Sequence, residues 1–138
     1  MAGCLTDNYR SSRVDPNLPD SLRVEKNFVR YALSGNVSLR EAVGMVSSVL
    51  ACCREQHHRR LLLDVTNLYG FDFPTFGERY RIARQWAREA GGDVIAAMVA
   101  RPELIHPEQV IVYVAAREGF HCGAFTEESA AIEWLLSQ

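Results

Sequence analysis

The chain has 138 residues, a formal net charge of -2, and 48% hydrophobic and 23% charged residues. These values are ordinary for a globular protein of one domain. No long run of Lys and Arg is present, so the composition argues against a protein that binds nucleic acid by neutralising phosphates.

The distribution of apolar residues predicts a cytoplasmic protein without an integral membrane segment. No apolar run approaches the roughly 20 residues that a membrane-spanning helix needs. The segment MAGCLTDNYR lacks the apolar core of a secretory signal. We expect residues 1–20, which are polar and contain Pro16 and Pro19, to form a tail or irregular lead-in, and residues 21–138 to form a single α/β domain.

The first elements of that domain are a hairpin and a capped helix. Apolar residues alternate with polar ones between Leu22 and Leu33, and the Lys26-Asn27 pair suits a tight turn, so we expect a β-hairpin ending at Gly35. Ser38 and Glu41 have the spacing of a capping box ahead of a helical apolar pattern. The predicted helix spans about residues 38–56.

A strand and a second capped helix follow. The continuous apolar run LLLDV, residues 61–65, is typical of a strand buried on both faces. Pro74 precedes a second capping box, Thr75 to Glu78, and Gly91-Gly92 ends the helix that it starts. The apolar stripe expected to face the core is Phe76, Tyr80, Ala83, Trp86, Ala87 and Ala90. The arginines expected mostly on the other side are Arg79, Arg81, Arg84 and Arg88.

The remaining third of the domain continues the alternation of strand and helix. Residues 93–99 and 120–125 predict strands. Residues 110–116 are β-branched enough for a strand, but Pro107 and Gly119 bound them at helical length, so we predict a helix. Thr126 is expected to cap a last helix. The order β-β-α-β-α-β-α-β-α predicts a mostly parallel mixed sheet with helices packed on it.

This order, together with the segment around two aspartates, resembles the STAS domain of bacterial anti-sigma-factor antagonists. In that family an apolar strand ends in Asp, and a short loop leads to a second Asp and a helix N-terminus. Here the two acids are Asp64 and Asp72, eight residues apart as in the family. Within the superfamily the chain is similar to a branch described as STAS or SEC14-like. The motifs shared with that branch are Gly77-Glu78-Arg79, the Ala-rich segment ending in Arg101-Pro102, and the stretch from Phe125 to Trp134 and Leu135. The likeness covers about residues 21–137.

The resemblance implies a SpoIIAA-like fold and a regulatory module that acts as a homodimer or with a protein partner. One position departs from the family, because classical antagonists have a phosphorylatable serine directly after the second Asp. Phe73 stands there in this chain, followed by Pro74. Thr75 is the nearest hydroxyl, although its oxygen is expected to be engaged as an N-cap. Phosphorylation of Thr75 is therefore a hypothesis, since a phosphate at a helix N-terminus is electrostatically favourable.

The polar residues do not form a recognisable catalytic set. Asp64 and Asp72 suggest general acid–base chemistry, because paired carboxylates can divide those roles. The alternative, which we favour, is that both order the backbone around them. No nucleophile, phosphate-binding or dinucleotide motif is present, so we expect a non-enzymatic protein without a cofactor. Cys53, His57 and His58 have zinc-ligand spacing but lack a fourth ligand, and we expect the four cysteines to be free thiols.

The aromatic loop between the two capped elements leaves two functional hypotheses open. The first is a protein-binding module that recognises its partner through residues 66–78. The second is a carrier or sensor of a small apolar or lipid-like ligand, held near Tyr69, Phe73, Phe76 and Trp86 in a pocket of several hundred Å³. Phe71 and Phe76 also suit the core. The surface expected to bind partner or ligand comprises Asp64, Thr66, Asn67, Tyr69, Asp72, Phe73, Thr75 and Phe76.

Overall fold

A computed structural model describes residues 23–105 and 109–138. In these residues five strands form one sheet in the order β1-β2-β3-β4-β5. The strands are β1 (Arg23–Val24), β2 (Val29–Asn36), β3 (Arg60–Tyr69), β4 (Ile95–Val99) and β5 (Cys122–Phe125). The α-helices are α2 (Leu39–Glu55), α3 (Phe76–Ala90), α4 (Val110–Arg117) and α5 (Glu128–Leu136), and Pro102–Leu104 form a short 3-10 helix, η1. The predicted order of strands and helices is confirmed for this part of the chain.

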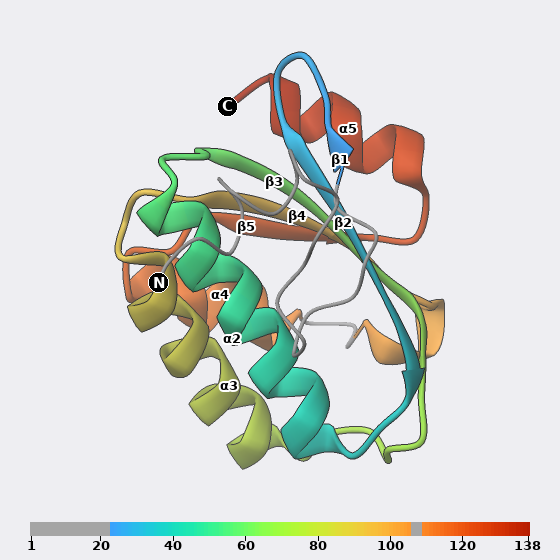
Figure 1. The fold of residues 1–138 in the computed structure, drawn as a ribbon. Coiled ribbons are helices and arrows are strands. Elements are labelled where there is room, and N and C mark those ends of the chain that lie inside the picture. Colours follow the sequence, from blue (N-terminus) through green and yellow to red (C-terminus); the bar gives the residue numbers. More distant parts are fainter. Residues whose placement is uncertain (1–22, 106–108) are drawn as a thin grey trace.

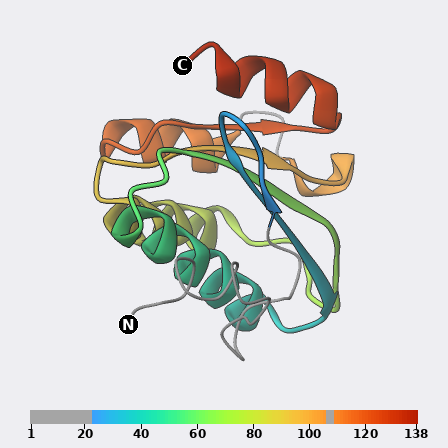
Figure 2. The same ribbon diagram turned by 45° about the horizontal axis from the view of Figure 1, so that its top comes forward.

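The sheet is mixed and lies between two layers of helix. β1 pairs antiparallel with β2, and every other neighbouring pair is parallel. Figures 1 and 2 show α5 on one face of the sheet and α2 and α3 on the other. α4 packs beside α3 and β5. This is the arrangement expected when successive strands are joined by helices that return the chain to the same end of the sheet.

The central strand β3 connects both halves of the core. Leu61 and Leu63 belong to the large apolar cluster beneath α2, α3 and α4, whereas Leu62 belongs to the smaller cluster beneath α5. All three side chains are buried. Alternate residues of a strand point to opposite faces, so a strand covered on both sides needs a continuous apolar run. The prediction of a doubly buried strand is confirmed.

Both predicted capping boxes are present. The Ser38 hydroxyl accepts a hydrogen bond from the Glu41 amide at 3.1 Å, and the Glu41 carboxylate accepts one from the Ser38 amide at 2.9 Å. At the start of α3, the corresponding distances between Thr75 and Glu78 are 3.2 and 2.8 Å. Gly91 then ends α3 in the left-handed conformation, with φ of 64°. These contacts satisfy backbone groups that a helix end leaves free.

Three predicted boundaries need correction or lie outside the described residues. β3 continues beyond Val65 to Tyr69, because β2 runs on beside it after an irregularity between Ala32 and Ser34. The final helix has Glu127 as its N-cap, without a side-chain capping bond, so the prediction of a Thr126 cap was wrong. Residues 110–117 are helical as predicted. The expected start at Pro107 and the lead-in 1–20 lie outside the described residues.

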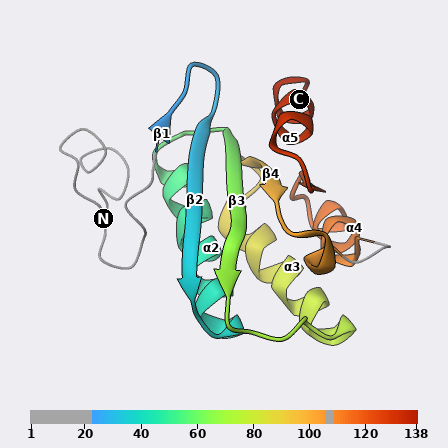
Figure 3. The same cartoon turned by 90° about the vertical axis from the view of Figure 1, so that its right-hand side faces the viewer.

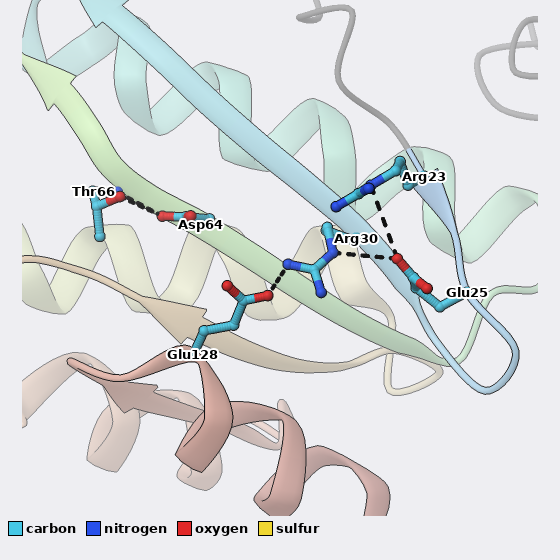
Figure 4. Close-up of polar contacts among 6 residues, drawn as sticks. All are labelled: Arg23, Glu25, Arg30, Asp64, Thr66 and Glu128. Carbon is cyan, nitrogen blue, oxygen red and sulfur yellow. Dashed lines mark hydrogen bonds and ion pairs between the residues drawn. The ribbon is translucent and has the colours of Figure 1, made fainter.

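Arg30 links the β1–β2 hairpin to α5, on the face of the sheet that α5 covers (Figure 4). Its guanidinium donates to Glu25 at 3.3 Å and to Glu128 at the start of α5. Burial of the side chain works against its charged form. The hydrogen bonds and charges of Glu128 and then Glu25 outweigh that effect and raise the pKa of Arg30. The network therefore anchors α5 against β2 at a position where the sheet carries polar side chains.

Gly70 holds the end of β3 against the chain that leaves β2. Its φ is 102°, and a Cβ there would lie 2.4 Å from the Asn36 side chain and 2.8–2.9 Å from the Val37 backbone. The Val37 amide meanwhile donates to the Tyr69 carbonyl at 2.8 Å. Gly44, on the exposed side of α2, has no atom within 4 Å of the corresponding position.

These two glycines predict substitutions of opposite sign. Gly70→Ala should destabilise the protein by about 1–3 kcal/mol, because the backbone conformation is strained for alanine and the space is occupied. Gly44→Ala should stabilise it by about 0.5–1 kcal/mol, since alanine loses less entropy than glycine in a helix interior. Urea unfolding of both variants checks this pair. Equal effects of the two substitutions would contradict it.

Candidate functional site

The expected site lies at the edge of the sheet where the parallel strands end. Figure 3 shows β2 and β3 pointing the same way, with the chain leaving them toward α2 and α3. We call residues 70–75, which connect β3 to α3, the carboxyl-edge loop. Ligands of α/β proteins commonly bind beyond the carboxyl ends of parallel strands.

The two aspartates lie in different surroundings. Asp64 is partly buried within β3, and one of its oxygens accepts hydrogen bonds from the Thr66 amide at 3.0 Å and the Thr66 hydroxyl at 2.7 Å (Figure 4). It alternates with Leu63 and Val65, which face α2 and α3, so Asp64 points to the α5 side of the sheet. Asp72 is exposed in the carboxyl-edge loop, and Asn67 is exposed on β3. The local backbone-ordering role that we favoured for Asp64 accounts for its contacts.

Four aromatic side chains are exposed around the loop. They are Tyr69 at the end of β3, Phe73 within the loop, and Phe76 and Tyr80 on the first two turns of α3. Phe76 and Tyr80 are four residues apart and therefore share one helix face. Phe76 is 67% exposed. The expectation that Phe76 and Tyr80 face the core was therefore wrong, whereas Phe71 does pack against the core. We call these four residues the aromatic surface.

The register of α3 explains that correction. Its buried positions are Arg79, Ile82, Ala83, Trp86, Ala87 and Ala90. They recur at three- and four-residue spacing, as an amphipathic helix requires. The predicted stripe is confirmed for Ala83, Trp86, Ala87 and Ala90. It was wrong for Phe76 and Tyr80, the aromatic residues of the first two turns, which are exposed. Ile82 lies four residues before Trp86, and Arg79 lies three residues before Ile82. This helical spacing was the sequence signal that could have predicted a buried Arg79.

Arg101 packs against the ring of Tyr69, one of the four residues of the aromatic surface. Its guanidinium lies 4.3 Å from the ring centroid and donates to the Leu68 carbonyl at 2.7 Å. Glu103 pairs with the same guanidinium at 3.1 Å. A cation over an aromatic face is attracted to the ring, so this contact holds Tyr69 in one orientation.

Thr75 sits between Phe73 and Phe76 and is exposed. Its oxygen accepts the Glu78 amide, so the expected N-cap role is confirmed. The first turn of α3 presents its backbone amides beside this hydroxyl, which is the feature that would favour a phosphate there. Phosphorylation of Thr75 stays a prediction.

An apolar cavity of about 120 Å³ lies behind the carboxyl-edge loop, between the sheet and helices α2, α3 and α4. Its walls include Phe71 and Pro74 from the loop, Trp86 from α3, and Leu63 and Val65 from β3. Of the aromatics expected to hold a ligand, only Trp86 lines it. Its volume is smaller than the several hundred Å³ that we anticipated. Arg79, which is 6% exposed, is the charged residue that the described part of the chain places in the wall.

The proposed zinc ligands do not come together. Cys53 is fully buried in the large apolar cluster, and burial raises the pKa of its thiol to about 12, whereas a zinc ligand must be a thiolate. His57 is exposed. No cluster of three or more metal-ligating side chains occurs in residues 23–105 or 109–138. Cys122 is also a free thiol, but Cys52 is disulfide-bonded, so the prediction of four free thiols was wrong for Cys52.

Comparisons with known proteins add no family assignment. No protein-family model matches the sequence, and a search of curated proteins finds no match. Among the helices that the structure describes, none is both long enough and apolar enough to cross a membrane.

His58 predicts a pH dependence of stability. Burial of the ring, and secondarily the charge of His57, lower its pKa in the folded protein. The unfolded chain therefore binds more protons near its ordinary pKa of about 6.5, and stability from the neutral ring is lost as the pH falls below that value.

His58→Gln should accordingly flatten the fall in unfolding free energy between about pH 7.5 and pH 5. Urea unfolding of wild type and variant at both pH values measures this difference. An identical pH slope in the two proteins would show that His58 does not contribute.

Proposed function

We propose that this protein is a non-enzymatic, STAS-like regulatory module that binds a protein partner through its aromatic surface. The observation that carries the proposal is the exposure of Tyr69, Phe73, Phe76 and Tyr80 around one loop at the carboxyl edge of the sheet. Isolated exposed apolar residues are common on proteins, but clustered aromatic residues are enriched at the centres of protein interfaces. The resemblance to antagonists of anti-sigma factors supports a regulatory role.

The surface suits recognition that does not depend on phosphorylation after the second Asp. Phe73 takes the place of the family's serine and is more than half exposed. An aromatic ring buries much apolar area on binding and loses little side-chain entropy, so it is an effective anchor. The partner in this proposal is a protein, either a different chain or a second copy that forms a homodimer.

A second function is favoured by the cavity. The described residues of its walls are apolar apart from Arg79 and Gln109, and a small apolar molecule would gain from leaving water for such a site. The protein would then act as a carrier or sensor of that molecule. Trp86 would be a wall of the site, and its indole nitrogen is already satisfied by the Val43 carbonyl at 3.2 Å.

Site-specific photocrosslinking in the source cells tests the first function. Benzoylphenylalanine placed at Phe73 or Phe76 should give one discrete adduct, because each ring would contact the partner. The matched control is Leu136, an exposed apolar residue of α5 on the opposite face of the sheet. An adduct of twice the chain's mass identifies a second copy as the partner.

The double variant Phe73→Ser/Phe76→Ser completes the test. It should abolish the adduct formed by a probe at Tyr80 and change the unfolding free energy by only about 0.5 kcal/mol per site, since both side chains are exposed. Adducts of equal yield at Leu136, or none at Phe73 and Phe76, would contradict binding through this surface.

A further inference from the structure

We propose that Arg79 binds the carboxylate of a small apolar acid whose hydrocarbon part occupies the cavity. This inference rests on the second function above and names the chemical class of the ligand. It starts from the placement of Arg79 in the wall of an apolar cavity.

Arg79 is buried without an ionic partner among the described residues. Its Nε donates to the Pro74 carbonyl at 3.1 Å, and this is the one hydrogen bond of its guanidinium there. None of the ion pairs in residues 23–105 and 109–138 includes it. The two terminal nitrogens thus lack an acceptor from this part of the protein.

The terminal nitrogens keep a little contact with solvent, because the fully buried polar atoms without a partner in the described residues do not include them. In an apolar wall this hydration is limited, and an anion that accepts their hydrogen bonds could replace it. Arg79 also lies in the first turns of α3, where the helix dipole disfavours a cation and favours an anion. Both effects are relieved if an anion enters the cavity beside the guanidinium.

The walls define the rest of the ligand. Among the described residues, the walls apart from Arg79 and Gln109 consist of apolar side chains and glycine, including Leu63, Val65 and Trp86. A volume of about 120 Å³ is slightly below that of an engineered cavity of about 150 Å³ that binds benzene. The site therefore suits an aliphatic chain or ring of about six carbons.

A carboxylate matches the guanidinium better than other anions of this size. Its two oxygens accept the parallel N–H bonds that a guanidinium fork presents. It also carries a single charge, whereas a phosphate monoester would bring a second charge into an apolar space at additional desolvation cost. Hexanoate is therefore a suitable probe.

Calorimetric titration of the full chain with hexanoate, hexan-1-ol and hexyl phosphate at pH 7 tests the assignment. Hexanoate should bind at least about tenfold more tightly than hexan-1-ol, which has the same chain without the charge. Hexyl phosphate should bind more weakly than hexanoate. Equal affinity for the acid and the alcohol would overturn the role of Arg79 but leave apolar ligand binding intact. Absence of binding by all three would overturn both.

Two variants separate binding from a purely structural role. Arg79→Met should weaken hexanoate about 10- to 100-fold and leave hexan-1-ol unchanged. Arg79→Lys keeps the positive charge but lacks the paired N–H donors of a guanidinium. This variant should retain part of the preference for hexanoate over hexan-1-ol. Arg79→Met also removes the hydrogen bond from Nε to the Pro74 carbonyl, so the affinity for hexan-1-ol is the control for an intact cavity. Unchanged hexanoate affinity, or an equal loss of affinity for hexanoate and hexan-1-ol, would instead indicate that Arg79 only braces the Pro74 carbonyl.

Neither result depends on the protein-binding proposal. Photocrosslinking at Phe73 and Phe76 reports on the aromatic surface, whose exposed rings do not line the cavity. Failure of hexanoate to bind would therefore leave that proposal standing, and failure of crosslinking would leave the ligand assignment standing.

Discussion

Burial of β3 on both faces is the constraint on which the rest of this structure depends. Leu61 and Leu63 must be covered by helices α2, α3 and α4, while Leu62 must be covered by α5. A strand with these requirements occupies the middle of the sheet, with parallel neighbours joined to it by helices. Its direction fixes where the chain leaves the sheet. The end of β3 thus fixes where the carboxyl-edge loop begins, and contacts of Phe71 and Pro74 hold the loop against the rest of the domain.

The carboxyl-edge loop contributes residues both to the aromatic surface and to the wall of the cavity. Phe73 extends outward to the aromatic surface, whereas Phe71 and Pro74 line the cavity. The Pro74 carbonyl accepts a hydrogen bond from Nε of Arg79, and the next residue, Thr75, caps α3. An anion bound to Arg79 would therefore lie close to residues 73–76, which carry Phe73 and Phe76 of the aromatic surface. Ligand binding in the cavity could in this way affect the surface proposed to bind a protein partner.

The sequence predicted the order of elements well because the strong signals were local. Two capping boxes and the run at residues 61–65 each mark an element by nearby residues alone. The later part of β3 was missed because its pairing with β2 depends on an irregularity near Ala32, which no local pattern records. The prediction was wrong for the first two turns of α3 because Phe76 and Tyr80 are apolar residues at helical spacing, although both side chains are exposed. Arg79 was placed outside for the converse reason, since its charge outweighed its spacing from Ile82.

Nitrogen-15 NMR can show directly whether the guanidinium of Arg79 binds a ligand inside the cavity. The chain has two tryptophans: Trp86 lines the cavity, and Trp134 packs with Phe125 on the α5 side of the sheet. Titration with hexanoate should shift the Arg79 Nε–H and Trp86 indole resonances saturably and together, while the Trp134 indole resonance stays unmoved. Unchanged Arg79 and Trp86 resonances at saturating hexanoate, or an equal shift of Trp134, would contradict this prediction.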